Sequence, residues 1–197
     1  GNLLYSDVRG TQAKKGAGGE LRGSYQAARN WQLGMELLVL DDKLDLNDAG
    51  YLERNGINRI GASMKYQYGN LEWLPSLKSL DFNLDAELAE NSSGDKLPSK
   101  LSVTASIKTK TNHKFWLDYD RAGSGVDDLI SRGFGNVSVN SRASWELGYT
   151  SPFGLPVTYD LEIARFQEGI TGWSNRAKAS VKVSITDGLS IEASTTV

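Results

Sequence analysis

Strict alternation of apolar and polar residues is the feature that most limits what this chain can fold into. The clearest case covers residues 177–186, where one face carries only apolar side chains: Ala177, Ala179, Val181, Val183 and Ile185. Lysine, serine and threonine fill most of the positions between them. A period of two residues is that of a β-strand with one apolar and one polar face. Asp187-Gly188 is typical of a tight turn, and the alternation resumes from 189 to 197, so this segment predicts a β-hairpin.

The same pattern recurs through most of the 197 residues and predicts about ten strands and no amphipathic helix. The predicted strands cover 21–27, 31–39, 60–68, 80–88, 101–108, 115–120, 145–149, 157–164, 177–186 and 189–197. Several approach the ~9–11 residues of a tilted membrane-spanning strand and exceed the ~5–6 residues usual in a soluble sandwich.

The connections between these strands alternate in character. Tight turns are predicted at 29–30, 111–113 and 187–188, and long polar loops at 41–58, 90–98 and 122–136. Short turns at one end and long loops at the other are typical of outer-membrane β-barrels. The pattern therefore predicts an antiparallel up-and-down transmembrane β-barrel, or an incomplete piece of a larger one. Four strands are predicted between loops 41–58 and 122–136, at 58–69, 77–90, 100–111 and 114–121. Because four is even, both loops should lie at the same, extracellular end.

The amino-acid composition is compatible with a β-barrel but does not by itself indicate one. A hydrophobic fraction of 39% and a mean hydropathy of −0.40 are those of a soluble chain, but barrel strands place polar residues in the lumen at every second position. No apolar run approaches the ~20 residues of a spanning helix. The net charge of −2 gives no sign of a nucleic-acid partner, and the lack of cysteine excludes thiolate sites. The start has no secretory signal and the end no terminal aromatic, so we expect one barrel segment, 1–197, from the C-terminal part of a longer protein.

The two faces of the predicted strands differ in charge. A barrel in a membrane presents its apolar face to lipid and its polar face to a wet lumen. We therefore predict an outward-facing set of Leu101, Val103, Ala105, Val181, Val183 and Ile185, and an inward-facing set of Asp81, Asp85, Glu87, Lys178 and Lys182. Aromatic residues near strand ends would form interfacial girdles: Trp31, Tyr66, Tyr68, Trp73, Tyr119, Trp145, Tyr149 and Trp173. The alternative is a soluble all-β carbohydrate-binding or adhesive protein, whose exposed aromatics would stack on sugar rings.

Two loops resemble segments of a family of outer-membrane barrels of unassigned function. The run Asn47-Asp48-Ala49-Gly50-Tyr51-Leu52-Glu53-Arg54-Asn55 resembles that family's Asn-Asp-x-Gly-aromatic-Leu-x-Arg-Asn loop. Asp127-Asp128-Leu129-Ile130-Ser131-Arg132-Gly133 is similar to its Asp-Asp-x-x-x-Arg-Gly segment. In those proteins a module resembling family 9 carbohydrate-binding modules precedes the barrel. The resemblance implies that such a module precedes this chain in a larger bacterial envelope protein.

The same two loops hold the candidate site residues, all in a loop-organising or ligand-contacting role: Asp48, Gly50, Tyr51, Arg54, Asp127, Asp128 and Arg132. Gly50 is suited to a positive φ, and Arg54 and Arg132 to pairing with loop carboxylates. The acidic run from Asp41 to Asp48 could offer oxygens to Ca²⁺, but an EF-hand register from Asp45 lacks two carboxylate ligands, so an exposed loop is the better interpretation.

No residue pattern supports catalysis or a cofactor. His113 is the only histidine, and without cysteine or a nucleophile elbow neither a zinc site nor a histidine-based triad has support. Gly16-Ala17-Gly18-Gly19 lacks the Gly-Lys-Ser/Thr ending of a phosphate loop and is predicted to be a flexible turn. We therefore expect a non-enzymatic protein of the bacterial outer membrane, with no cofactor, metal or nucleic-acid partner. Its partners would be membrane lipid and either a glycan or other envelope proteins. It would anchor a carbohydrate-binding-like module or pass a small polar solute, and a purely structural role gives the same sequence pattern.

Overall fold

The computed structural model describes residues 1–8, 14–44, 55–69, 75–130, 135–168, 172–186 and 189–197. Its strands are β1 (Asn2–Val8), β2 (Lys14–Ala28), β3 (Trp31–Leu40), β4 (Ile57–Gly69), β5 (Leu77–Asn91), β6 (Lys100–Thr109), β7 (Lys114–Ala122), β8 (Gly125–Asp127), β9 (Val137–Val139), β10 (Arg142–Thr150), β11 (Val157–Glu168), β12 (Gly172–Thr186) and β13 (Leu189–Thr196). The described residues form no helix, so none of them belongs to a helix able to cross a bilayer. The prediction of an all-β chain is confirmed.

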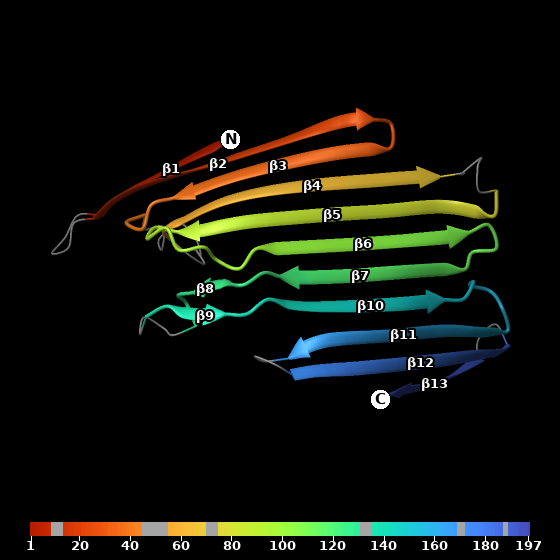
Figure 1. The fold of residues 1–197 in the computed structure, drawn as a ribbon. Helices are drawn as coiled ribbons and strands as arrows, with labels where there is room; N and C mark the ends of the chain where they lie inside the picture. The colour runs from red at the N-terminus through yellow and green to blue at the C-terminus, as the bar shows by residue number, and fades with distance from the viewer. Residues whose placement is uncertain (9–13, 45–54, 70–74, 131–134, 169–171, 187–188) are drawn as a thin grey trace.

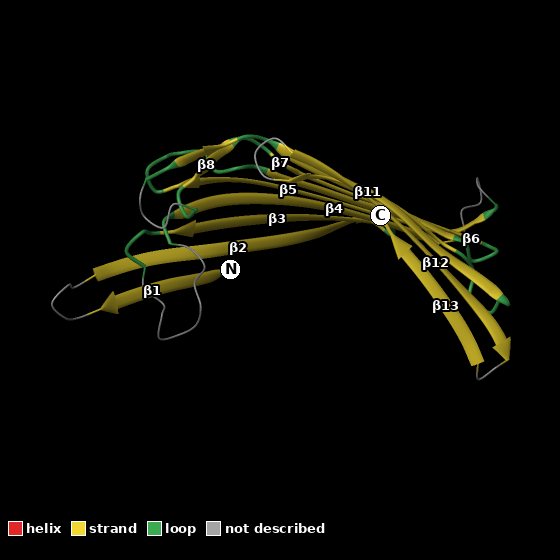
Figure 2. Ribbon diagram, turned by 90° about the horizontal axis from the view of Figure 1, so that it is seen from below, coloured by secondary structure: helices red, strands yellow, loops and turns green. Residues whose placement is uncertain are grey.

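Eleven of the strands form one antiparallel sheet in up-and-down order (Figure 1). Each strand pairs with the next one in the chain, except that β7 pairs with β10, because β8 and β9 form a separate two-stranded sheet between them. Among the described strands, β1 and β13 each have a neighbour on one side only, so the sheet has two open edges. Figure 2 shows this sheet as a single twisted, curved layer.

The predicted tight turns at 29–30 and 111–113 lie at one end of the sheet and the predicted long loops at the other, although seven residues separate β4 from β5 at the first end and three separate β11 from β12 at the second. Residues 29–30, 110–113 and 151–156 connect strands at one end, which we name the short-turn end. Residues 41–56, 92–99 and 123–141 connect strands at the opposite, long-loop end (Figure 1). Strands β4 to β7 lie between the first and last of these long connections, which confirms that both are at the same end. The turn residues 187–188 lie outside the described residues, although β12 and β13 pair around them.

The strand register gives the sheet one continuous apolar face. Directly paired residues in an antiparallel sheet lie on the same face. Leu37 pairs with Ile60, which pairs with Leu88. Further along the sheet the same face carries a row of paired residues from β6, β7, β10, β11 and β12: Ala105, Leu117, Leu147, Ile163 and Ala177. We name this the outer face, and the opposite face, which carries Glu36, Arg59, Asp118 and Glu162, the inner face.

Exposure shows which face is hollow. On the outer face Leu37 and Ile60 are 41% and 43% exposed, whereas the neighbouring inner-face side chains of Glu36 and Arg59 are only 29% and 28% exposed. Two hollows, of about 920 and 800 Å³, are lined mainly by inner-face residues. In this part of the sheet the aliphatic residues are therefore on the more exposed side and are not packed into a dry core. The register places ten of the eleven named positions on the two faces as predicted, aliphatic residues on one and charged residues on the other; Ile185 lies in a β-bulge and has no paired residue.

The sequence interpretation missed three strands and part of a fourth. Strand β1 and the short pair β8 and β9 have too few alternating side chains to be recognised. The prediction of a flexible turn at 16–19 is wrong, because these residues belong to β2. Their glycines have a steric purpose: a Cβ on Gly16 would lie 2.1 Å from the backbone N of Leu44, and one on Gly18 2.7 Å from Cδ2 of Leu40. Because glycine has no side chain, a glycine-rich part of a strand does not show the alternation of apolar and polar residues from which strands were predicted.

Candidate functional site

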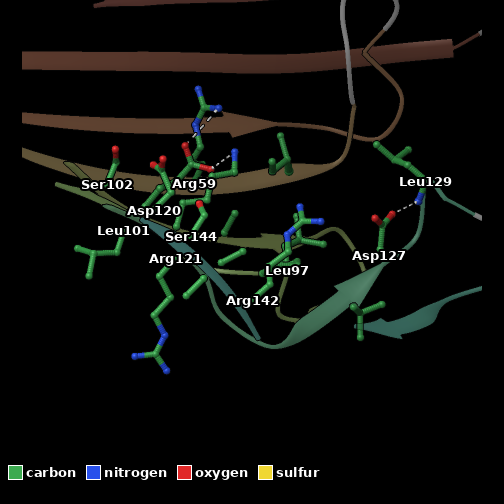
Figure 3. A pocket seen from close by; sticks show the side chains of 18 of the residues that line it. Arg59, Leu97, Leu101, Ser102, Asp120, Arg121, Asp127, Leu129, Arg142 and Ser144 are labelled. Carbon is green, nitrogen blue, oxygen red and sulfur yellow. Dashed lines mark hydrogen bonds and ion pairs between the residues drawn. The ribbon is translucent and has the colours of Figure 1, made fainter. Parts of the chain in front are cut away.

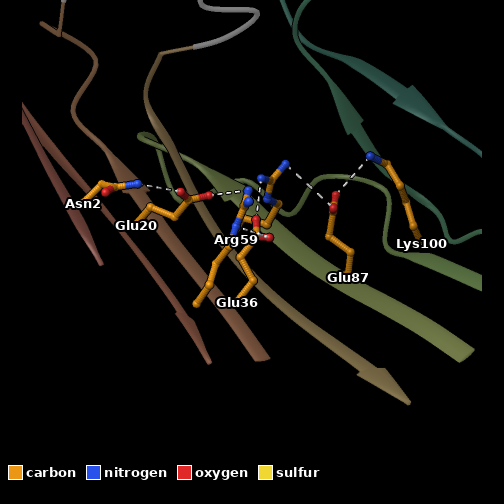
Figure 4. Close-up of polar contacts among 7 residues, drawn as sticks. Asn2, Glu20, Glu36, Arg59, Glu87 and Lys100 are labelled. Atoms are coloured by element: carbon orange, nitrogen blue, oxygen red, sulfur yellow. Dashed lines mark hydrogen bonds and ion pairs between the residues drawn. The ribbon is translucent and has the colours of Figure 1, made fainter. Parts of the chain in front are cut away.

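A row of alternating charges crosses the inner face from β2 to β6 (Figure 4). Its members, which we name the charge ladder, are Glu20, Arg22, Glu36, Arg59, Glu87 and Lys100. The Arg22 guanidinium lies 2.5 Å from Glu20 and 3.1 Å from Glu36. Each link joins opposite charges, so the ladder presents both signs side by side without a net excess of either.

Arg59 joins the two halves of the ladder. Its guanidinium nitrogens lie 2.7 Å from Oε1 of Glu36 and 3.8 Å from Oε2 of Glu87, and Glu87 lies 3.0 Å from Nζ of Lys100. Gly61 is the residue that pairs with both Glu36 and Glu87. Because Gly61 has no side chain, the space between the two carboxylates is open to Arg59.

A second charged cluster lies on the inner face of β10, β11 and β12. One Nη2 atom of Arg176 is 2.9 Å from Glu146 and 2.6 Å from Glu162. The guanidinium carbon also lies 4.9 Å from the centre of the Phe166 ring, a cation–π arrangement. One arginine thus holds two carboxylates from neighbouring strands.

The charge ladder separates the two hollows of the inner face. Arg59, Glu87, Lys100 and Ser102 line both of them. The larger hollow extends to the long-loop end, where Asp120, Arg142 and Asp127 add charge and Leu97 and Leu129 add an apolar wall (Figure 3). The smaller hollow extends towards the short-turn end and is lined by polar residues of β2 to β5, among them Gln32, Lys65 and Asn83. A solute moving along the inner face from one end to the other would pass the ladder.

Three long connections are joined to one another at the long-loop end. The Ser92 N–H donates to the Gly56 carbonyl at 2.9 Å, which joins the first connection to the second. The Gly123 and Val126 N–H groups donate to the Ser99 and Lys96 carbonyls at 2.7 and 2.8 Å, which joins the third to the second. The mouth of the larger hollow is therefore built from three segments that are distant in sequence.

Asn91, which is 5% exposed, holds this mouth together. Its Nδ2 donates to Asp95 and Asp128 at 3.1 Å each, and its Oδ1 accepts from the N–H groups of Ser93 and Asp95 at 3.0 and 2.8 Å. Asn136 donates to the same Asp95 carboxylate at 2.7 Å. Sequence interpretation missed Asn91, although its position ahead of Ser92-Ser93-Gly94 is the signal of an Asx turn.

The first long connection begins with a turn packed on β2. Leu44 is fully buried, and its carbonyl accepts a hydrogen bond from Nδ2 of Asn55. The Asp41 carboxylate accepts from the Lys43 N–H at 2.9 Å, and this bond lowers the pKa of Asp41. The described residues contain no group of three or more potential metal ligands, and Asp45, Asn47 and Asp48 of the acidic run lie outside them.

Only part of the predicted site can be placed. Asp48, Gly50, Tyr51, Arg54 and Arg132 lie outside the described residues, so their predicted roles stay predictions. Asp127 lies at the mouth, where its Oδ1 accepts from the N–H groups of Leu129 and Ile130 at 3.0 and 2.9 Å. Asp128 accepts from Asn91. Asp127 therefore hydrogen-bonds within its own loop, and Asp128 joins that loop to Asn91. His113 lies at the short-turn end, 2.9 Å from the Tyr149 hydroxyl.

The Trp116 side chain lies on the inner face, and its indole ring occupies the space beside Gly148, its paired residue. A Cβ on Gly148 would be 2.0 Å from Cε2 of the Trp116 ring, so this position requires glycine. We expect Gly148→Ala to lower the free energy of unfolding by about 1–3 kcal/mol, the usual cost of overpacking. In a Trp116→Ala background the same substitution should cost less than about 0.5 kcal/mol, because the ring is gone. Urea unfolding of the four variants in lipid vesicles measures the coupling, and equal costs in both backgrounds would contradict it.

The strand order, the opposite faces and the two kinds of connection define a class: the chain has the fold of an outer-membrane β-barrel, in an antiparallel up-and-down sheet whose described strands do not close. A solved structure similar to it is that of Pseudomonas aeruginosa OccK11 (OpdR), at a TM-score of 0.54 and 14% sequence identity. The alignment covers 98% of this chain and 56% of the OccK11 chain, so the chain spans about half the length of that protein. No protein-family model and no curated protein sequence matches the chain.

Proposed function

We propose that this chain is part of a bacterial outer-membrane β-barrel whose inner face forms a polar passage for small solutes. The observation that carries the proposal is the inverted exposure of the two faces. Aliphatic side chains such as Leu161 and Ile163 are 44% and 50% exposed, whereas the charge ladder lies on the hollow side. Water does not favour an apolar surface of this extent, but a bilayer does.

The single layer of the sheet argues against the soluble alternative. A soluble β-sandwich buries its apolar faces between two packed sheets. Among the described residues the buried leucine and alanine residues are Leu40, Leu44 and Ala164, and all three lie at the first loop or on the inner face. No described element covers the outer face, so the adhesive or carbohydrate-binding alternative leaves that face without a partner.

The proposal includes closure of the barrel by further strands. An open edge leaves backbone N–H and C=O groups without partners, which is unfavourable in hydrocarbon. The edges at β1 and β13 therefore need additional strands, and the 56% coverage of OccK11 supports strands from the same protein. The two loop resemblances support a preceding module like family 9 carbohydrate-binding modules, with glycan or envelope-protein partners. On this proposal the barrel anchors that module and has no enzymatic role.

Cysteine scanning tests the orientation of the faces, since the chain has no cysteine of its own. We expect single cysteines at the inner positions 102, 104 and 106 to react with a membrane-impermeant maleimide in reconstituted vesicles. Cysteines at the outer positions 103, 105 and 107 should be protected, because lipid excludes the polar reagent. Equal labelling of both sets would exclude the membrane orientation. A bulky maleimide on Ser102→Cys, which lines both hollows, should also reduce ion conductance, and unchanged conductance would exclude the passage.

A further inference from the structure

The outer face of β7, β10, β11 and β12 carries almost no charge, but two arginines interrupt it at the long-loop end. Arg121 lies one residue before the end of β7, and Arg165 lies three residues before the end of β11. Arg121 pairs with Leu101 and Ala143, and Arg165 with Trp145 and Asn175, so both belong to the outer face. In Figure 3 the Arg121 side chain points away from the hollow, on the other side of the sheet from Asp120.

No carboxylate of the described residues pairs with either arginine, whereas the inner-face Arg22, Arg59 and Arg176 each contact two. The outer rows of β7, β10, β11 and β12 contain no other charged side chain in their described part. Both arginines are exposed. A cation on a lipid-facing surface is costly unless it reaches the interface and meets an anion.

Aromatic residues surround these two cations. The guanidinium carbon of Arg165 lies 4.5 Å from the centre of the Trp173 ring, which is 47% exposed. Trp145 stands opposite both Arg165 and Tyr119. Tryptophan and tyrosine are enriched at the level of lipid headgroups, so these rings place the arginines at the membrane interface. Arg121 and Arg165 are two strands and two residues apart, roughly 12 Å between Cα atoms, so their long side chains can approach one headgroup.

We propose that Arg121 and Arg165, with Trp145 and Trp173, form a binding site for an anionic phosphate-bearing lipid headgroup in the leaflet next to the long loops. This site rests on the proposed membrane orientation and adds a lipid preference to it. Guanidinium groups recognise phosphate through paired hydrogen bonds, and the tryptophan rings pack against the adjoining acyl chains. The preference should weaken as salt rises, because the headgroup region is open to water.

The test uses the complete barrel protein that contains this chain, in zwitterionic micelles doped with brominated lipid, which quenches tryptophan fluorescence on contact. We expect brominated phosphatidic acid to quench at roughly tenfold lower concentration than brominated phosphatidylcholine. The double variant Arg121→Gln/Arg165→Gln should reduce this ratio to near one. Lys182→Gln removes a cation from the inner face and should leave the ratio unchanged.

Each outcome has a distinct meaning. Equal quenching by the two lipids in the unsubstituted protein, or a preference that survives in the double variant, would overturn the lipid site and leave the membrane orientation intact. Absence of quenching by either lipid would instead reject the proposed function itself. Folding of each variant is checked by its β-sheet circular dichroism. The conservative variant Arg121→Lys/Arg165→Lys should keep a preference for phosphatidic acid, because it keeps both charges.

Discussion

A lysine at position 105 is expected to destabilise the protein in a bilayer by about 2–4 kcal/mol, the cost of a cation on the lipid face near the membrane midplane. Ala105 lies in the middle of β6 and pairs with Phe82 and Leu117, so its neighbours on the outer face are apolar. The side chain is also too far from either end of the strand to bring its ammonium group to the interface. Urea unfolding in phosphatidylcholine vesicles measures the change.

The adjacent residue supplies the matched control. Ser106 lies on the inner face, where it pairs with Asp81 and Trp116. Ser106→Lys adds the same charge to the same strand, but beside a carboxylate and in a wet hollow, so we expect a change within about 0.5 kcal/mol. Equal costs at 105 and 106 would mean that the two faces meet the same solvent. A larger cost at 106 would mean that the inner face is the buried one.

Local patterns in the sequence were enough to predict ten of the thirteen strands, at least in part, and the faces of their side chains. The four strands predicted at 58–69, 77–90, 100–111 and 114–121 correspond to Ile57–Gly69, Leu77–Asn91, Lys100–Thr109 and Lys114–Ala122. These boundaries agree within two residues because alternation ends where turn residues begin. The end at which each long connection lies then follows from counting strands, which needs no knowledge of register.

The contacts of the site depend on register, which no local pattern reveals. Glu36 and Arg59 meet only because Trp31 pairs with Tyr66 across a connection of sixteen residues, 41–56. A shift of two residues would keep every side chain on its face and still separate the two charges. The same holds for Asn91 and Asp128, which come from different connections. The sequence therefore predicts which face is charged, but the partners within that face emerge only from the folded sheet.

Asn91→Ala is expected to open the mouth without unfolding the sheet. The substitution removes four hydrogen bonds of a nearly fully buried side chain and leaves the Asp95 and Asp128 carboxylates without its amide. We estimate a local cost of about 2–4 kcal/mol, since buried partners left unsatisfied cost more than an average hydrogen bond. The backbone N–H groups of Ser92 and Val126, which join the three connections, should then exchange with deuterium roughly 30- to 1,000-fold faster.

Asn83→Ala is the control for this experiment. Asn83 lies on the inner face of the same strand, and its Nδ2 makes one hydrogen bond, to Thr104 at 3.0 Å, away from the mouth. Its loss should leave exchange at Ser92 and Val126 within about twofold, because local openings at the two places are independent. If the Val126 N–H exchanged with deuterium at an unchanged rate in Asn91→Ala, its hydrogen bond to the Lys96 carbonyl would be enough to hold β8 in place without Asn91. Faster exchange throughout β5 and β6 would show that Asn91 supports the sheet rather than the mouth, because only a cooperative opening of these strands exposes their paired backbone groups.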